Sequence, residues 1–331
     1  MKIPEKLYPL ADRLMAVLGA MPAPLKQLLA KVLGGAVASG VLPLRRVVRR
    51  NLAFAYPHWT GEQIRRHSVD IFQNIFETFF EICRLPRMSV PDIEKSVRIV
   101  GKEHLMAAMD NPGGIILVSA HIGNWEISPM VVRQITGRTV TSVARPLGNA
   151  WADRWITLLR TRFGNRIVSK EGALQEMTRT LRNGGILGIL IDQVTKRSDG
   201  VAVRFFGKRV MATPGAALLA LRCKSKVLPA YCVRENGSLV MHIQPSLDLV
   251  RSGDLRKDIV VNTQIMNDAL VDIIRANSSQ WFWFHKRWKR FYPDLYPEYQ
   301  AKRRRRRKKE LRALQKAGVT VDDPEGYVNN L

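Results

Sequence analysis

One run of residues determines the architecture that we expect for this chain: Ile115-Ile116-Leu117-Val118-Ser119-Ala120-His121-Ile122-Gly123-Asn124-Trp125-Glu126. A short apolar run rich in branched side chains follows two glycines and ends at His121, which is typical of a buried strand in a parallel sheet. Gly123 and Asn124 break the pattern, and Asn124 is a favourable N-cap for a helix that begins at Trp125. His121 is therefore expected at the carboxyl end of a strand, where open α/β sheets bind their ligands.

The spacing between His121 and Glu126 limits the chemistry of this segment. On one continuous helix, residues five apart would point about 140° away from each other. A tight turn between them would instead bring the carboxylate to the imidazole. An imidazole that is oriented and charge-stabilised by a carboxylate is a general base for a hydroxyl group. A structural ion pair is the alternative, and because such pairs are common the spacing alone leaves both interpretations open.

The chain from Val97 onward alternates apolar strands with amphipathic helices. Expected strands lie at residues 97–100, 115–120, 140–144, 167–168, 186–191, 227–233 and 239–244, and expected helices at 105–109, 149–162, 173–182, 215–222 and 259–276. This alternation predicts an α/β fold with a largely parallel central sheet that is flanked by helices on both faces.

The first 84 residues are expected to be mostly helical, with a turn at residues 51–57. Residues 1–50 carry apolar stripes punctuated by Lys and Arg, and 44–50 are strongly basic, which favours amphipathic helices that dock on an anionic membrane. A core-packed helix pair with a basic outer face is the alternative. Thr60 and Gln63 form a possible capping box for a helix that runs to Arg84. The longest uncharged apolar run, Val32 to Leu44, is shorter than the roughly 20 residues that span a bilayer.

The overall charge points to an anionic partner. The 331 residues contain 53 Lys and Arg against 28 Asp and Glu, a formal net charge of +25. A phospholipid surface, a phosphorylated glycolipid, an acidic protein or a nucleic acid would each satisfy such an excess. The composition, with 46% hydrophobic residues, excludes a disordered protein. Three scattered cysteines show no metal or redox spacing, and they favour a reducing compartment.

Two basic segments near the carboxyl terminus have several interpretations. Residues 280–288 interleave aromatic and basic side chains, as in nucleic-acid stacking, an interfacial aromatic belt or a segment that closes the core. Lys302 to Lys309 is an uninterrupted basic run, expected to be solvated and partly disordered. A basic nucleic-acid-binding protein is the competing function of another class, but it leaves the segment around His121 without a purpose. No nucleic-acid partner is therefore expected.

Three parts follow from these patterns: amphipathic, membrane-interfacial helices at 1–57, an α/β domain at 58–290 and a basic tail at 291–331.

A metal site formed by His121, Glu126 and Asp192 lacks any tighter ligand motif, so no metal is expected. No Gly-x-Ser-x-Gly turn and no cysteine with a partner motif occurs. Any group transfer at this site is therefore expected to be direct, without a covalent intermediate on the enzyme.

Several motifs occur together in one order. They are Arg49-Arg50-Asn51-Leu52-Ala53-Phe54-Ala55-Tyr56-Pro57, the His-x4-Glu unit at 121–126, Ala144-Arg145-Pro146, Gly188-Ile189-Leu190-Ile191-Asp192-Gln193, Phe205-Phe206-Gly207, Thr213-Pro214-Gly215 and Trp283-Phe284-His285-Lys286-Arg287-Trp288. Over roughly residues 5–290 the chain resembles the bacterial lipid A biosynthesis acyltransferases, the late acyltransferases within the wider lysophospholipid acyltransferase group. It departs from many members at Val194, where they carry a second Asp.

This resemblance implies transfer of a fatty acyl group from an acyl thioester, usually on acyl-carrier protein, to a hydroxyl of a phosphorylated lipid A precursor. His121 is then the general base, and Glu126 orients its ring. Acyl-CoA is the alternative donor, and a lysophospholipid or a mannosylated inositol lipid is the alternative acceptor. The enzyme is expected at the cytoplasmic face of the inner membrane, as a peripheral or monotopic protein without a cofactor.

The remaining site residues are expected to bind substrate or to stabilise the transition state. Arg145, or the helix-start amides near Asn124, would donate hydrogen bonds to the oxyanion that forms from the thioester carbonyl. Asp192 and Gln193 lie at the end of another strand. Asp192 is expected to order Arg145 or the acceptor, or only to cap its own loop.

Overall fold

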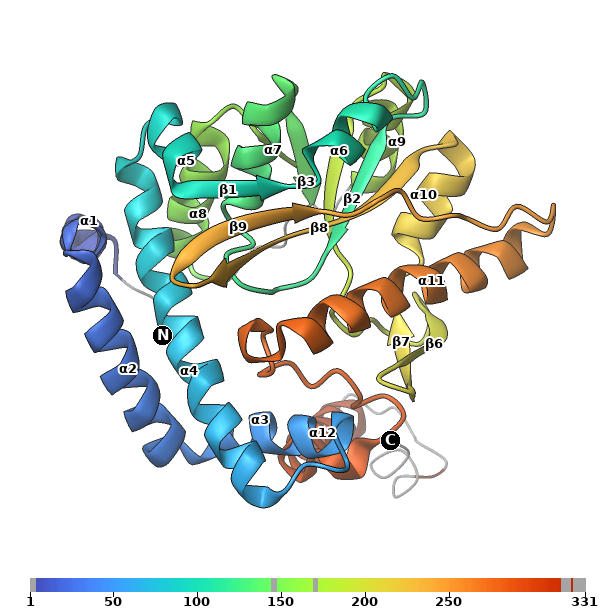
Figure 1. The fold of residues 1–331 in the computed structure, drawn as a ribbon. Coiled ribbons are helices and arrows are strands. Elements are labelled where there is room, and N and C mark those ends of the chain that lie inside the picture. Colours follow the sequence, from blue (N-terminus) through green and yellow to red (C-terminus); the bar gives the residue numbers. More distant parts are fainter. Residues whose placement is uncertain (1–3, 144–147, 169–171, 317–322, 324–331) are drawn as a thin grey trace.

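The computed structural model describes residues 4–143, 148–168, 172–316 and 323, and its centre is a seven-stranded sheet (Figure 1). In spatial order the strands are β1 (Val97–Val100), β9 (Ser238–Ile243), β8 (Lys226–Glu235), β2 (Ile115–Ser119), β5 (Ile186–Leu190), β3 (Val140–Val143) and β4 (Arg166–Val168). All neighbouring strands are parallel except β8 and β9. The expected α/β fold with a largely parallel sheet is confirmed.

Helices cover both faces of the sheet because alternate residues of each strand point to opposite sides. Ile116 and Val118 of β2 join a core that includes side chains from α9 (Ala173–Arg182), α10 (Gly215–Cys223) and α11 (Leu255–Ala276). Ile115 and Leu117 join a second core with α5 (Val90–Ser96), α6 (Lys102–Ala108), α7 (Ser128–Thr136) and α8 (Ala150–Arg162). Strand β2 is thus buried from both sides, as its continuous apolar sequence predicts.

The order of the strands brings two distant segments together. Strands β2 and β5 are hydrogen-bonded neighbours in register, with Ser119 opposite Leu190. His121 and Asp192 each lie two residues beyond those positions, so both follow the carboxyl end of a strand at the same edge of the sheet. A pair of residues 71 positions apart in the sequence therefore meets at this edge.

Several predicted elements differ from the structure. The helix expected to begin at Trp125 begins at Ser128, because residues 125–127 form a turn in which the Asn124 side chain accepts a hydrogen bond from Ile127 N. Residues 51–57 were expected to be a turn, yet α3 (Leu42–Ala55) continues through most of them. The hairpin of β6 (Val201–Phe205) and β7 (Lys208–Ala212) was not predicted, because its strands are short and partly exposed.

The carboxyl-terminal segment is more ordered than its composition indicates. Helix α12 (Pro297–Lys316) contains the whole basic run, which was expected to be partly disordered. Its first turn is tied to α3, since Glu298 pairs with Arg50 at 2.8 Å and the Tyr296 hydroxyl donates to Asn51 Oδ1 at 2.6 Å. The domain boundaries at 57/58 and 290/291 stay predictions.

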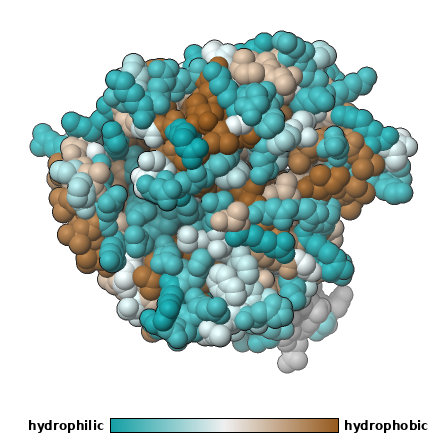
Figure 2. All heavy atoms as spheres, in the orientation of Figure 1, coloured by the Kyte–Doolittle hydropathy of each residue, from teal (hydrophilic) through white to brown (hydrophobic). Residues whose placement is uncertain are grey.

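Three amino-terminal helices, α1 (Tyr8–Ala20), α2 (Ala23–Gly40) and α3, lead into the long helix α4 (Gly61–Arg84), whose predicted capping box between Thr60 and Gln63 is present. Figure 2 shows hydrophobic side chains gathered over α1 and α2 at the left of the molecule. In the described residues, no individual helix has both the length and the apolarity to cross a membrane. The segments 5–20 and 23–40 pass that test only as a pair, bent by 111°.

Helix α2 packs closely against α4 at a glycine. A Cβ atom added at Gly34 would lie 2.6 Å from the backbone nitrogen of Gln73 in α4, whereas one added at the adjacent Gly35 would meet nothing within 4 Å. Both glycines are inside α2. The close approach of the two helix backbones therefore depends on the missing side chain at Gly34 and not on Gly35.

This pair gives a matched test of the packing. We expect Gly34→Ala to lower the free energy of unfolding by about 1–3 kcal/mol, because the added methyl group forces the two helices apart. Gly35→Ala is the control, and it is expected to raise the free energy of unfolding by roughly 0.5–1 kcal/mol through reduced chain entropy. Chemical denaturation measures both, and equal effects of the two substitutions would contradict the proposed contact.

Candidate active site

The imidazole of His121 is held by a buried carboxylate. His121 Nδ1 lies 2.8 Å from Asp192 Oδ1, and the backbone N–H of His121 donates to Asp192 Oδ2 at 2.9 Å. The indole N–H of Trp281 donates to the same Oδ2 at 2.9 Å. Asp192 is only 3% exposed, and its two oxygens accept three hydrogen bonds. The ring of His121 is thereby fixed, with Nδ1 engaged by the carboxylate and Nε2 on the opposite side of the ring, near Gln193.

The pKa values of this pair reflect their mutual attraction. Burial by itself would lower the pKa of His121, but the Asp192 charge and its hydrogen bond outweigh burial, so the pKa is raised above its ordinary value. Burial would likewise raise the pKa of Asp192, yet His121 and the N–H donors hold it well below the usual range. Asp192 therefore stays ionised, and His121 is a stronger base than a free imidazole.

The aromatic and basic segment near residue 285 closes the core around this pair. Trp281, Trp283 and Trp288 are fully buried. His285 Nε2 accepts a hydrogen bond from Val194 N at 2.9 Å, and burial lowers the pKa of His285 to about 3, so this ring is neutral. Of the three interpretations of this segment, the structure supports the core-closing one, because its aromatic faces are not available for stacking with bases.

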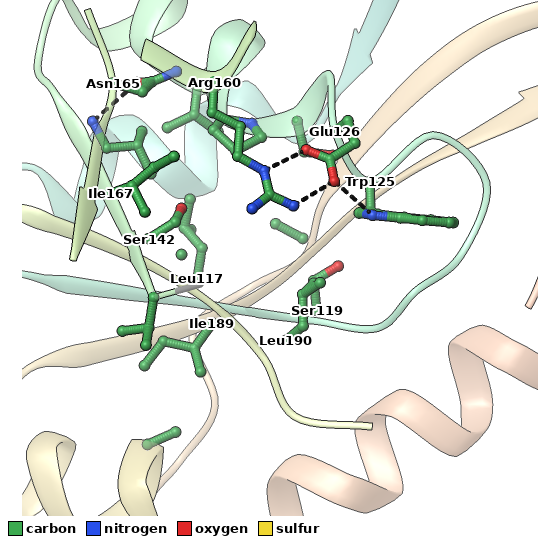
Figure 3. Close-up of a pocket in the computed structure, with 18 of the residues that line it drawn as sticks. Leu117, Ser119, Trp125, Glu126, Ser142, Arg160, Asn165, Ile167, Ile189 and Leu190 are labelled. Carbon is green, nitrogen blue, oxygen red and sulfur yellow. Dashed lines mark hydrogen bonds and ion pairs between the residues drawn. The ribbon is translucent and has the colours of Figure 1, made fainter. Parts of the chain in front are cut away.

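Glu126 does not contact the His121 ring, so the predicted His121–Glu126 pair does not form. Its two oxygens accept from Arg160 Nε at 2.7 Å and Nη2 at 2.6 Å, and Oε1 also accepts from the Trp125 indole at 3.1 Å (Figure 3). The turn at 125–127 directs the carboxylate toward α8, while Asp192 occupies the place beside the imidazole. Glu126 acts on His121 only through space, by a smaller charge effect than that of Asp192.

Arg160 is a site residue that the sequence analysis missed. Burial would lower the pKa of Arg160, but the bidentate contact with Glu126 raises it. The third guanidinium nitrogen, Nη1, has no hydrogen-bond partner among the described residues, and Figure 3 shows it turned away from Glu126 toward the side of Leu117 and Ser142. No local motif marks Arg160. Its place in the last turn of α8, opposite the turn at 125–127, is a tertiary feature.

The other predicted site residues have different positions. Gln193 lies at the mouth of the site, with Nε2 3.4 Å from His121 Nε2. Asn124 is fully buried, its side chain bonds Glu81 and Ile127, and its backbone N–H donates to Cys232 O at 2.9 Å, so its own backbone amide is not available for an oxyanion. The predicted role of the neighbouring amides stays a prediction. Arg145 lies outside the described residues. The expectation that Asp192 orders Arg145 is thus untested, whereas its contact with His121 is plain.

A cavity of about 500 Å³ opens beside His121. This is within the usual range of roughly 300–1,000 Å³ for small-molecule sites. Its wall is mostly apolar. His121, Glu126, Arg160 and Gln193 line it near the strand ends, and Ser142, Asn165 and Arg166 add polar groups elsewhere in the wall. No cluster of three or more metal-ligating side chains occurs in the part of the chain that the structure describes. The arrangement combines a base, a hydrogen-bond donor and a space for a hydrocarbon chain.

Comparison with known proteins agrees with this geometry. The sequence profile of the bacterial lipid A biosynthesis acyltransferases matches residues 10–290. The chain is 26% identical over 273 residues to a lipid A biosynthesis acyltransferase of Haemophilus influenzae, covering 81% of this chain and 83% of that protein. It is also 27% identical over 214 residues to a phosphatidylinositol mannoside acyltransferase of Mycobacterium tuberculosis (63% and 66%), and 25% identical over 262 residues to one of Mycolicibacterium smegmatis (77% and 82%).

The profile match spans most of the chain, including every segment that forms the site around His121. The sheet, the buried His–Asp pair and the cavity all lie within the matched residues. The chain is an acyltransferase that belongs to the bacterial lipid A biosynthesis acyltransferase family.

Proposed function

We propose that this acyltransferase moves a fatty acyl group from the thioester of an acyl-carrier protein to a hydroxyl of a lipid A precursor or a similar phosphorylated glycolipid. The observation that carries the proposal is the hydrogen bond between His121 Nδ1 and buried Asp192 at the mouth of a largely apolar cavity. The net charge of +25 supports partners that are acidic or phosphorylated. The names of the mycobacterial relatives make a mannosylated inositol lipid the second candidate acceptor.

His121 is the general base in the proposed reaction. A lipid hydroxyl is a poor nucleophile until its proton is removed, and Nε2 of His121 takes that proton while the hydroxyl oxygen bonds to the thioester carbonyl carbon. Asp192 stabilises the resulting imidazolium and keeps the ring in the productive orientation. The carbon–sulfur bond then breaks, and the thiolate takes the proton back from His121. The products are an ester and the free thiol of the carrier.

Arg160 is the proposed donor to the oxyanion. The carbonyl oxygen becomes negatively charged in the tetrahedral intermediate, and fixed donors that face it contribute a large share of catalysis. Arg160 is fixed by its two contacts with Glu126, and Nη1 remains available on the cavity side. This arrangement gives Glu126 a positioning role, in place of the predicted contact with His121.

The function is tested with purified enzyme and defined substrates. Acyl-carrier protein and coenzyme A thioesters are each offered with a lipid A precursor, a mannosylated inositol lipid or a lysophospholipid, and mass spectrometry detects the acylated product. We expect product from the carrier-protein donor and the lipid A precursor. His121→Gln is expected to lower the rate by about 10²–10⁴, the usual contribution of a general base.

His104→Gln is the control, because His104 lies beside Glu103 on the surface. Its rate is expected to equal that of the unmodified enzyme. The proposed function fails when neither donor acylates any of the three acceptors, and the role of His121 fails when His121→Gln retains the full rate.

The pH dependence separates the roles of the two carboxylates. Because the pKa of His121 is raised, the acidic limb of kcat/KM is expected above the ordinary imidazole value of about 6.5. In Asp192→Asn burial prevails, the pKa of His121 falls, and the limb moves to lower pH while the plateau drops. Glu126→Gln is expected to lower the plateau with a smaller shift. A larger shift for Glu126→Gln than for Asp192→Asn would show that Glu126 is the main partner.

The amino-terminal helices are the proposed membrane-docking surface, at the cytoplasmic face of the inner membrane. Leu10, Leu14 and Val17 form an outward stripe on α1 and are 54–64% exposed, and Leu28 and Val32 continue it on α2 at 57% each. Monomeric proteins rarely expose contiguous apolar stripes of this kind, which suit the interface of a bilayer. Docking there would bring the enzyme to its lipid acceptor.

Vesicle co-sedimentation tests this surface. Leu14→Glu/Val17→Glu is expected to weaken binding to vesicles that contain phosphatidylglycerol, because two charges replace two apolar contacts. Val90→Glu/Met106→Glu is the matched control, since it adds the same charge at residues 51% and 44% exposed on α5 and α6. Equal binding of the two double variants would contradict a specific role for the stripe.

A further inference from the structure

The cavity beside His121 reaches both faces of the sheet. One lobe lies on the side of α7 and α8, and its wall includes Leu117, Met130, Val132, Val140 and Ser142. The other lobe lies on the side of α9 and α10, with Met177, Ile189, Gly215, Ala216 and Leu219. The two lobes meet beyond the short strands β3 and β5, so a chain that starts at the catalytic histidine has two directions in which to extend.

Strand β5 has a notch on the side of the first lobe. Gly188 lies between Leu117 of β2 and Ser142 of β3 in the sheet register, and all three line the cavity. Its neighbours on the strand, Leu187 and Ile189, point to the other face. Gly188 is thus a residue without a side chain in the middle of a row of larger ones, on the strand next to the one that leads to His121.

The backbone conformation does not require a glycine at this position, and the only close neighbours of an added Cβ are two side chains that also line the cavity. A Cβ added at Gly188 would lie 3.2 Å from Ser142 Oγ and 3.4 Å from Val140 Cγ1, with nothing else within 4 Å. Gly123 is different, because it has a φ of +52° and a Cβ there would collide with the backbone of Cys232. A side chain at Gly188 would therefore press against Ser142 and Val140 and narrow the cavity that these residues line. Glycine inside a strand often marks the close approach of a ligand.

The position of Gly188 along β5 defines how deep in the cavity the notch lies. Leu190 is at the carboxyl end of β5 beside the site, and Gly188 lies two residues further in, about 7 Å at the usual rise per residue. Val140, opposite Ile186, is two residues deeper and still lines the cavity. A hydrocarbon chain that enters at His121 along this face must pass Gly188 before it reaches Val140.

We infer that Gly188 is a specificity-determining residue for the length of the donor acyl chain. The inference rests on the proposed function. The donor chain lies in the lobe between the sheet and α7, it passes over Gly188, and the missing side chain leaves room for the methylene groups beyond that point. The chain of the acceptor lipid lies elsewhere, so acceptor selection does not depend on this residue.

A donor series tests the inference with the full-length enzyme and one acceptor, the acceptor being whichever one the unmodified enzyme acylates. Initial rates are measured with carrier-protein thioesters from butyryl to palmitoyl. For Gly188→Val we expect kcat/KM for the palmitoyl donor, relative to the hexanoyl donor, to fall by about 10- to 200-fold, the range for one misplaced methylene group in an apolar pocket. Gly188→Ala is expected to give a smaller change in the same direction.

Gly215→Val is the matched comparison, because it enlarges the wall of the opposite lobe, and a Cβ at Gly215 makes only an ordinary contact with Thr213 at 3.6 Å. Its palmitoyl-to-hexanoyl ratio is expected to equal that of the unmodified enzyme. An unchanged palmitoyl-to-hexanoyl ratio in Gly188→Val overturns the inference, as does a ratio that changes in Gly215→Val instead.

In a second series the donor is kept constant and the chain length of the acceptor lipid is varied. The acceptor preference of Gly188→Val is expected to equal that of the unmodified enzyme. A changed acceptor preference would assign this lobe to the acceptor and overturn the inference.

Gly188→Cys gives a measurement that does not depend on turnover. The three native cysteines are buried. A thiol at position 188 is expected to react with a small maleimide, and a long-chain donor analogue is expected to protect it while a butyryl analogue does not. Equal protection by both analogues overturns the inference. Failure of the unmodified enzyme to transfer any acyl group would instead be a failure of the proposed function.

Discussion

The buried carboxylate of Asp192 is the constraint on which the site depends. Its two oxygens accept from the His121 backbone, the His121 ring and the Trp281 indole. A carboxylate removed from water is costly unless such donors surround it. The donors come from His121, after the end of β2, and from Trp281, in the closing segment (residues 281–288). The charge of Asp192 therefore fixes the position of these two distant parts of the chain relative to each other. It also fixes the tautomer of the imidazole.

The closing segment makes this constraint rigid. Trp281, Trp283 and Trp288 fill the core, and the Asn51 side chain of α3 donates to the carbonyl oxygens of Trp283 and His285. Arg287 is a fully buried cation whose guanidinium lies over the Phe205 ring and bonds Asn267; burial lowers its pKa to about 10, while Asp192 opposes that shift. The segment that resembled a nucleic-acid surface in its composition is thus the internal support of the site.

Two carboxylates, Asp192 and Glu126, belong to the site, whereas the sequence motif indicated Glu126 alone. The His-x4-Glu spacing brings Glu126 into the cavity wall, but the turn after Asn124 directs it to Arg160, where it fixes a guanidinium. Asp192, from a different strand, then pairs with the imidazole. In the proposed mechanism this division separates the base from the donor to the oxyanion, and the part of the cavity between β5 and α7 takes the acyl chain.

The sequence by itself determined the elements that have strong local signals. The apolar run ending at His121, the capping box at Thr60 and the Asp-Gln after the next buried strand follow from burial and from hydrogen bonds within a few residues, so strand and helix positions in the α/β part were predicted closely. The motifs that resemble the family lie mostly in these segments. Helix α12 was not predicted, because eight like charges repel one another, whereas Glu298 and Tyr296 bind the start of this helix to α3.

Only the tertiary structure decided which of these residues meet. The order β2–β5–β3 is a property of the sheet, and no local pattern specifies that Asp192 rather than Glu126 reaches His121, that Arg160 of α8 lies opposite the turn at 125–127, or that Gly188 leaves a notch in the cavity. Side chains at strand ends are brought together by hydrogen bonding between strands that are far apart in the sequence. Their contacts depend on that pairing and not on the spacing of residues along the chain.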